Sequence, residues 1–288
     1  MLTLVGLIVV FVGVFGGYVL SGGKMGIILH ALPFEGMMIG GAAVGSFLAS
    51  NGGTVAGKGL KGIGRTIKGS KWKKQDYQDS LSLLFAISKM VRTKGPIALE
   101  AHIENPEESA IFTEYPRILG DHFAIELITD YLRMTTMNFD DVHQIEEIMD
   151  KEIEKHHHEE IKASDALQGM ADALPALGIV AAVLGVIKTM ASISEPPEIL
   201  GFLIGGALVG TFLGVLLAYG VVGPLASRLK GVIDEDGMLY NVIKDVMVAH
   251  LHGNSPQISV EIGRQAVPSK LKPSFYELEE ALAEIPVA

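Results

Sequence analysis

The sequence predicts an all-α polytopic membrane protein with four transmembrane helices and a helical cytoplasmic domain formed by the loop between the second and third helices and by the C-terminal tail. Of its 288 residues, 49% are hydrophobic and only 19% are charged, whereas about a quarter are charged in an ordinary soluble domain. The charge is also segregated, since residues 1–23, 36–57 and 199–227 contain no Asp, Glu, Lys or Arg. Because about 20 apolar residues cross a hydrocarbon core of about 30 Å, these runs are long enough to span it.

The four spans are expected at defined places along the chain. The first covers about residues 2–20. Pro33 is a reasonable helix start, so the second span is expected at about 34–50, where a run of Asn and Gly then stops it. The third is expected at about 170–192 and the fourth at about 199–222, with a proline-rich acidic turn between them.

The distribution of Lys and Arg predicts the orientation. These residues gather just after the second span and follow the fourth, whereas the other two turns offer only Lys24 or acids. By the positive-inside rule, both termini and the long loop are therefore cytoplasmic. The predicted domains are two transmembrane helices in 1–53, a cytoplasmic helical loop in 54–166, two pore-lining transmembrane helices in 167–223 and a cytoplasmic tail in 224–288.

Composition and motifs argue against several functions. The chain has no cysteine, which excludes disulfides and thiolate metal sites, and its net charge of −10 argues against a nucleic-acid partner. No paired carboxylates, activated nucleophile or phosphate-binding loop forms a credible catalytic site. We therefore expect no enzyme, no cofactor and no metal. Consecutive helix positions point in different directions, so His156-His157-His158 is expected to be a solvated face rather than a metal site.

The predicted spans carry no carboxylate near their middles. Asp172 lies near one end of the third span and Lys188 near the other end, where it can reach outward to water. Ion transfer within a bilayer normally needs an ionisable side chain. If the chain moves ions, that group is expected to come from a partner.

The glycines, two prolines and one threonine within or beside the spans each allow two structural interpretations. Glycines spaced four apart in the second and fourth spans predict close helix packing, either inside one chain or between subunits. Pro175 and Pro224 are either tolerated kinks or hinges. The hydroxyl of Thr211 either bonds to its own backbone or faces a pore.

Several long motifs together resemble one family. The third span reads LPALGIVAAVLGV at 174–186, and the fourth reads VGTFLGVLLAYG at 209–220. The loop contains IENPEES at 103–109 and YPRIL at 115–119, and the tail contains PSFYELEE at 273–280. These stretches, in this order, resemble the MotA family of flagellar motor stator proteins, within the wider MotA/TolQ/ExbB proton channel family. The resemblance covers essentially the whole chain.

The resemblance implies an assembly in the bacterial inner membrane. It implies a ring of about five copies around a dimer of single-span MotB helices, an arrangement consistent with small-residue packing faces. MotB would bring the membrane aspartate and anchor the unit to peptidoglycan. Ion flow past that aspartate would drive rotation, and the cytoplasmic loop of this chain would push the rotor.

The resemblance also assigns roles to charged loop residues. Arg92 and Glu100 match the charges that engage the rotor protein FliG, and Lys94 in the same stretch is expected to share the role. Without the resemblance, each would be read as a solvated surface charge.

In the spans, Pro175 and Pro224 match the two functional prolines of the family, which favours the hinge interpretation. Thr211 matches a hydroxyl of the conduction path. Ala182 stands where sodium-driven relatives carry Thr, so protons are the expected ion, and a sodium-driven stator remains the alternative.

Two other functions compete with this one. An energiser of outer-membrane processes of the ExbB or TolQ type would have three spans, so the four spans and the stretch 92–100 argue against it. A membrane scaffold without conduction would need neither Pro175 nor Thr211 facing a pore.

Overall fold

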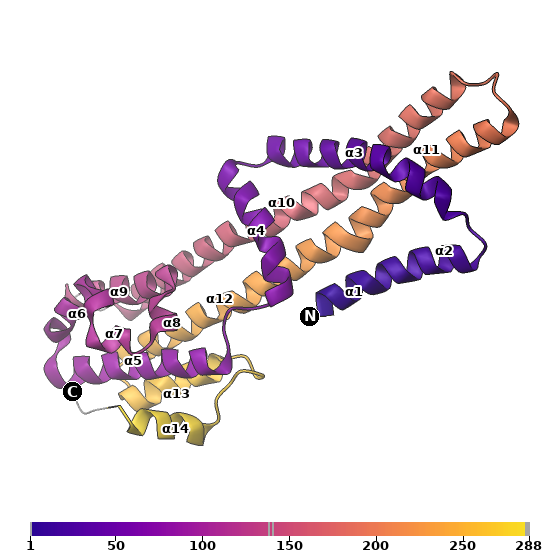
Figure 1. Cartoon of the computed structure of the whole chain (residues 1–288). Coiled ribbons are helices and arrows are strands. Elements are labelled where there is room, and N and C mark those ends of the chain that lie inside the picture. Colours follow the sequence, from indigo (N-terminus) through magenta and orange to yellow (C-terminus); the bar gives the residue numbers. More distant parts are fainter. Residues whose placement is uncertain (1, 138, 140, 286–288) are drawn as a thin grey trace. The chain divides into compact units, whose positions relative to one another are not determined.

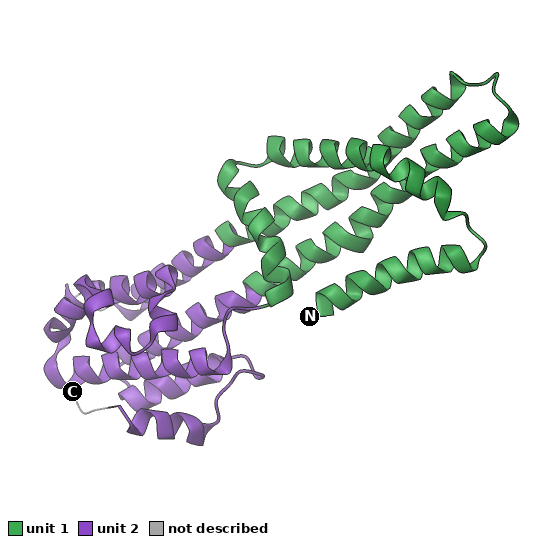
Figure 2. Ribbon diagram, viewed as in Figure 1, with its two compact units in different colours: residues 1–69, 159–233 green, residues 70–158, 234–288 purple. Residues whose placement is uncertain are grey.

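The computed structural model describes residues 2–137, 139 and 141–285, and within those ranges it contains helices and turns but no strand (Figure 1). The predicted all-α fold class is confirmed. The chain divides into two compact units (Figure 2). Unit 1 comprises residues 1–69 and 159–233, and unit 2 comprises residues 70–158 and 234–288.

Unit 1 contains the apolar helices. Among the described residues, four helical stretches are long and apolar enough to cross a membrane, as the sequence predicted. The first is made of α1, the π-helix η1 and α2, and the others lie in α3, in α10 and in the run α11–η4–α12. Their bounds are α1 Leu2–Phe11, η1 Val12–Gly16, α2 Gly17–Leu20, α3 Met25–Ser50, α10 Val142–Met190, α11 Pro197–Leu217, η4 Ala218–Val222 and α12 Gly223–Leu251.

Helix α3 starts earlier than predicted. The apolar residues before Pro33 are part of the helix, which begins at Met25, so Pro33 lies inside the helix instead of starting it. The buried positions of α3 recur every three or four residues straight through the proline and include Glu35: Ile28, Ala31, Glu35, Ile39, Ala43 and Phe47. Packing of this one face against the rest of unit 1 stabilises the helix despite the backbone bond that proline removes.

Two predicted boundaries between helices do not exist. Helix α10 joins the end of the predicted cytoplasmic loop and the third span into one helix of 49 residues. After the fourth span, α11 passes through the π-helix η4 directly into α12. The π turn ends just before Gly223-Pro224. A widened turn there suits a proline, whose ring would otherwise clash with the carbonyl one turn earlier.

Helix α4 (Gly53–Lys68) carries much of the basic cluster that follows the second span. It packs closely on its own unit, since a Cβ on Gly62 would lie 2.5 Å from a methyl carbon of Leu229. Lys58 and Arg65 bind the two carboxylate oxygens of Glu160 at 2.7 and 3.0 Å.

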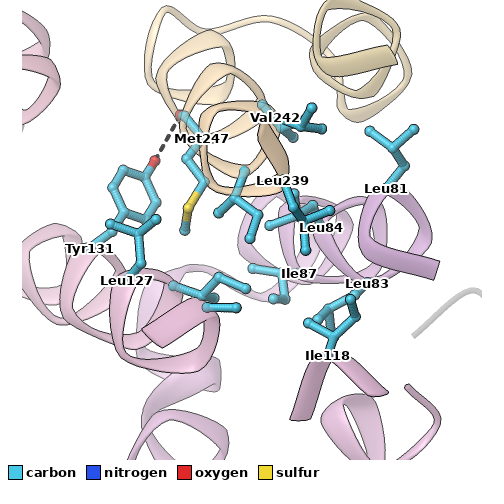
Figure 3. Packing of buried hydrophobic residues seen from close by; sticks show 14 of the residues in the cluster. Leu81, Leu83, Leu84, Ile87, Ile118, Leu127, Tyr131, Leu239, Val242 and Met247 are labelled. Atoms are coloured by element: carbon cyan, nitrogen blue, oxygen red, sulfur yellow. Dashed lines mark hydrogen bonds between the residues drawn. The ribbon is translucent and has the colours of Figure 1, made fainter. Parts of the chain in front are cut away.

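Unit 2 is a helical domain with its own hydrophobic core. Figure 3 shows side chains from the cluster packed together, with the Tyr131 hydroxyl donating to the Met247 carbonyl at 3.0 Å. The remaining elements are α5 Lys74–Lys94, η2 Pro96–Leu99, α6 Glu100–Glu104, η3 Pro106–Glu108, α7 Ala110–Thr113, α8 Pro116–Leu119, α9 His122–Thr136, α13 Pro256–Ala266 and α14 Phe275–Ala283.

Polar contacts hold the segment before α5 and the start of α14 in place. Asp236 is buried and accepts hydrogen bonds from the Ser70 hydroxyl at 2.7 Å and the Lys71 amide at 2.8 Å. Ser274 and Glu277 form a capping box at the start of α14. Such boxes satisfy backbone N–H groups that a helix start leaves unpaired.

Candidate functional site

The backbones of α10 and α11 touch at a glycine seam. A Cβ on Gly178 would lie 2.8 Å from the Gly210 carbonyl oxygen and 3.1 Å from the Gly214 Cα. A Cβ on Gly214 would in turn lie 2.6 Å from the Leu174 carbonyl oxygen and 2.8 Å from the Gly178 Cα. Side chains larger than hydrogen do not fit here, so glycine sets the closeness of the two helices.

For some of the glycines, the seam shows whether they pack inside one chain or remain open for packing between subunits. Gly210 and Gly214 pack inside the chain. In contrast, a Cβ added at the glycines of α3, or at the first glycine of α11, meets nothing within 4 Å: Gly36, Gly40, Gly41, Gly45 and Gly201. These positions present a smooth helix surface that is open in the single chain.

Ala182 and Thr211 lie at this seam on facing helices. The Cβ position of Gly210 is 3.1 Å from the Ala182 backbone nitrogen, and Thr211 is the next residue of α11. Both side chains are half-buried. The two residues to which the family resemblance assigns an ion path therefore occupy neighbouring positions along this seam, although they are distant in the chain.

The two prolines occupy different environments. Pro175 is half-buried inside α10, directly after Leu174, whose carbonyl faces Gly214. Its missing N–H leaves the carbonyl of Ala171, one turn earlier, without its helical donor. Pro224 is exposed at the second position of α12, after the π-helix η4. π turns inside helices are often found at functional sites.

Glu35 contradicts the expectation that no span contains an internal carboxylate. It lies well inside α3 and is only 6% exposed. Its Oε2 is 2.6 Å from where a Cβ of Gly210 would stand. The prediction fails because a span that begins at Pro33 places Glu35 at a helix end, whereas α3 begins at Met25. The helical spacing of apolar residues across Pro33 is the signal that identifies it. The need for an acidic residue from a partner can therefore no longer be inferred from a lack of internal acids in this chain.

Arg92, Lys94 and Glu100 lie together in sequence around the end of α5 in unit 2, and all three are exposed. Gly95, with φ of +82°, ends α5 and turns the chain into η2, and Ile97 in that turn is 76% exposed. The segment thus presents two cations, an apolar side chain and an acid to solvent. This composition suits a contact with a charged protein surface.

The histidine run is only partly the solvated face that was expected. His158 is exposed. His156 stacks on Phe123 with ring centroids 3.8 Å apart, and it meets the Tyr240 ring edge to face at 5.4 Å. His157 Nε2 lies 3.3 Å from an Asp234 carboxylate oxygen. Within the described ranges, no group of three or more metal-ligating side chains is present.

Comparison with known families gives two matches along the chain. The model of the motility protein A N-terminal region matches residues 4–95, and the model of the MotA/TolQ/ExbB proton channel family matches residues 122–241.

Curated relatives match almost the full length. The chain is 43% identical to motility protein A of Salmonella typhimurium and 42% identical to that of Escherichia coli, in each case over 97% of this chain and 94% of the relative. It is 34% identical to the chemotaxis protein LafT of Vibrio parahaemolyticus over 97% of both chains.

Solved structures share the fold. The structure of C. jejuni MotAB matches with a TM-score of 0.71 at 20% identity, covering 93% of this chain and 95% of that chain. The flagellar MotAB stator complex from Bacillus subtilis matches with a TM-score of 0.67 at 21% identity, covering 93% and 96%. Given the close full-length relatives, this chain belongs to the motility protein A family, within the MotA/TolQ/ExbB proton channel family.

Proposed function

We propose that the chain is a stator subunit of the bacterial flagellar motor that forms an ion channel with a MotB-type partner and converts ion flow into torque. The observation that carries this proposal is 43% identity to a motility protein A over 97% of the chain. The family's role is that of a motor and channel component, which is not enzymatic. The structure supports it with four membrane-length helices and a separate helical unit.

The proposed location is the bacterial inner membrane, with both termini and unit 2 in the cytoplasm. The basic residues of α4 support this orientation, because they immediately follow α3 and would face the cytoplasmic leaflet. The short turn between α10 and α11 carries Glu195 and Glu198 and no Lys or Arg, as suits the opposite side.

The proposed assembly is a homo-oligomer, about five copies around a MotB dimer, in line with closed symmetric rings. The solved relatives are described as MotAB complexes, which supports a MotB-type partner here. The open glycines of α3 support close helix contacts beyond the single chain, since they meet nothing within it.

The proposed ion is the proton, and the proposed path runs along Ala182 and Thr211. Ala182 offers no hydroxyl to coordinate a sodium ion, whereas Thr211 offers one for water or a passing ion. Pro175 and Pro224 are proposed to couple the path to unit 2, because each interrupts the backbone bonding of a helix that contributes residues to both units.

The proposed rotor contact is the exposed segment that carries Arg92, Lys94 and Glu100, and the proposed partner there is the rotor protein FliG. Exposure of both signs of charge allows complementary pairing with an opposing charged surface, which steers and orients association.

An energiser of the ExbB or TolQ type is the weaker alternative. The match of residues 4–95 to the motility protein A N-terminal model favours the motor function over it.

Complementation tests the proposal. In flagellated bacteria from which motility protein A and its partner have been deleted, this chain expressed with its own MotB-type partner is expected to restore swimming, and neither chain alone is expected to do so. Swimming that continues without sodium and stops with a protonophore supports protons, and the reverse supports sodium. A membrane-inserted complex that gives no motility in either condition would contradict the proposal.

A further inference from the structure

Glu35 lies in a setting that simple helix packing does not explain. Only 6% of its surface is exposed, and its Oε2 has no hydrogen-bond partner among the described residues. Burial of an unpaired carboxylate oxygen is costly, and ionisable residues inside membrane segments commonly serve ion pathways. An apolar residue of similar size would pack against α11 without that cost.

Glycines on both partner helices leave room for this carboxylate. A Cβ on Gly210 of α11 would lie 2.6 Å from Oε2, and a Cβ on Gly185 of α10 would lie 3.7 Å from Oε1. The same Gly210 position is 3.1 Å from the Ala182 backbone nitrogen, and Thr211 follows Gly210 directly. The carboxylate therefore reaches the α10–α11 seam beside the two residues of the proposed ion path.

A cavity of about 300 Å³ adjoins Glu35. The charged or titratable side chains that line it, besides Glu35, are Lys188 from α10 and His30 from α3, and the buried hydroxyl of Thr189 lies there too. Helix α11 contributes only apolar residues and glycine to the lining. Lys188 and His30 are exposed, so the cavity connects polar groups at the surface with the buried carboxylate.

We propose that Glu35 is a proton-binding carboxylate of the ion path, contributed by this chain itself. The carboxylate takes a proton from a hydronium ion that arrives through water in the cavity, which leaves a neutral water molecule, and becomes a neutral carboxylic acid. It then passes that proton to the membrane carboxylate of the partner and returns to its charged form, so no proton is gained or lost over a cycle. This inference rests on the proposed stator function.

The test uses the complex of this chain with its MotB-type partner, reconstituted in liposomes. Glu35→Gln keeps the shape of the side chain but cannot carry a proton, so proton flux is expected to fall by about tenfold or more, equivalent to about 1.4 kcal/mol in the barrier. Glu35→Asp, which keeps a shorter carboxylate, is expected to retain part of the flux. Glu198→Gln removes an exposed charge from α11 away from the cavity and is the matched control, with flux unchanged.

Infrared difference spectra on acidification give a second measurement that does not depend on transport. A protonated-carboxyl band is expected in the wild-type complex and in Glu198→Gln and is expected to lose intensity in Glu35→Gln. Equal flux in Glu35→Gln and wild type, or an unchanged band, would overturn the inference.

A purely structural ion pair between Glu35 and Lys188 predicts a different pattern. In that case removal of either charge would impair the complex, and the double variant Glu35→Gln/Lys188→Gln would recover flux. Under our inference the double variant stays as low as Glu35→Gln alone, and recovery would contradict it. If the wild-type complex itself neither conducts nor supports motility, the stator function fails; if the wild type conducts and Glu35→Gln conducts equally, only this inference fails.

Discussion

The glycine seam gives a prediction whose size follows from the structure. Gly214→Ala would place a Cβ 2.6 Å from the Leu174 carbonyl oxygen and 2.8 Å from the Gly178 Cα. Both obstacles are backbone atoms, which cannot move aside like the end of a side chain, so α10 and α11 must separate. Overpacking of this kind costs about 1–3 kcal/mol, whereas the better helix propensity of Ala returns about 1 kcal/mol. The expected net effect is a destabilisation of up to about 2 kcal/mol.

Gly201→Ala is the matched control for this prediction. It makes the same chemical change in the same helix, but the new Cβ meets nothing within 4 Å. We expect it to leave stability unchanged or raise it by up to about 1 kcal/mol through helix propensity alone. Thermal unfolding of the purified membrane protein in detergent, followed by circular dichroism, should therefore give the lowest unfolding temperature for Gly214→Ala. A Gly214→Ala protein as stable as Gly201→Ala would refute the close contact between α10 and α11.

Three further predictions concern the coupling and the stability of unit 2. Reversing both charges with Arg92→Glu and Glu100→Lys should lower the torque of tethered cells several-fold, because like charges then oppose the rotor, while co-purification with the partner persists; normal torque would remove these residues from the contact. Pro175→Ala should impair swimming several-fold without loss of membrane insertion, since the restored backbone bond stiffens α10, and normal swimming would make the proline a tolerated kink. Hydrogen bonds from Lys74 and from the N-terminus of α14 lower the pKa of Glu277 to about 2. A carboxylate with a lowered pKa stabilises the fold above its unfolded value of 4.5 and loses that effect as pH falls toward 2. An NMR titration of the Glu277 side chain should therefore show a midpoint well below 4.5 that rises in Lys74→Ala, and equal midpoints would contradict the pairing.

The sequence predicted the four apolar helices because hydrophobicity and length alone decide whether a helix crosses a membrane. The predicted start of α3 was wrong because Pro33 is a local signal for the start of a helix, and the packing of α3 overrides that signal. Buried residues recur on one face from Ile28 to Phe47, and that contact outweighs the bond lost at the proline.

Only part of the candidate site was predictable, because packing between helices, and not local sequence, decides which residues meet. Thr211 and Ala182 could be named from the resemblance, but their meeting at one seam depends on which face of each helix turns inward. Which glycines pack inside the chain is a question of helix rotation, and glycine spacing is alike at Gly210 and at Gly45 even though only Gly210 is covered. Glu35 required both pieces of information, a helix that continues through Pro33 and a glycine opposite the carboxylate.

Proton flux into liposomes tests the central claim most directly, that this chain forms an ion path only together with a partner. The complex of the two chains should acidify the vesicle interior under an imposed proton gradient. The purified chain alone should acidify it no faster than the interior of empty vesicles acidifies. Equal flux from the homomeric chain alone would contradict the account, because the ion path would then be complete within this polypeptide.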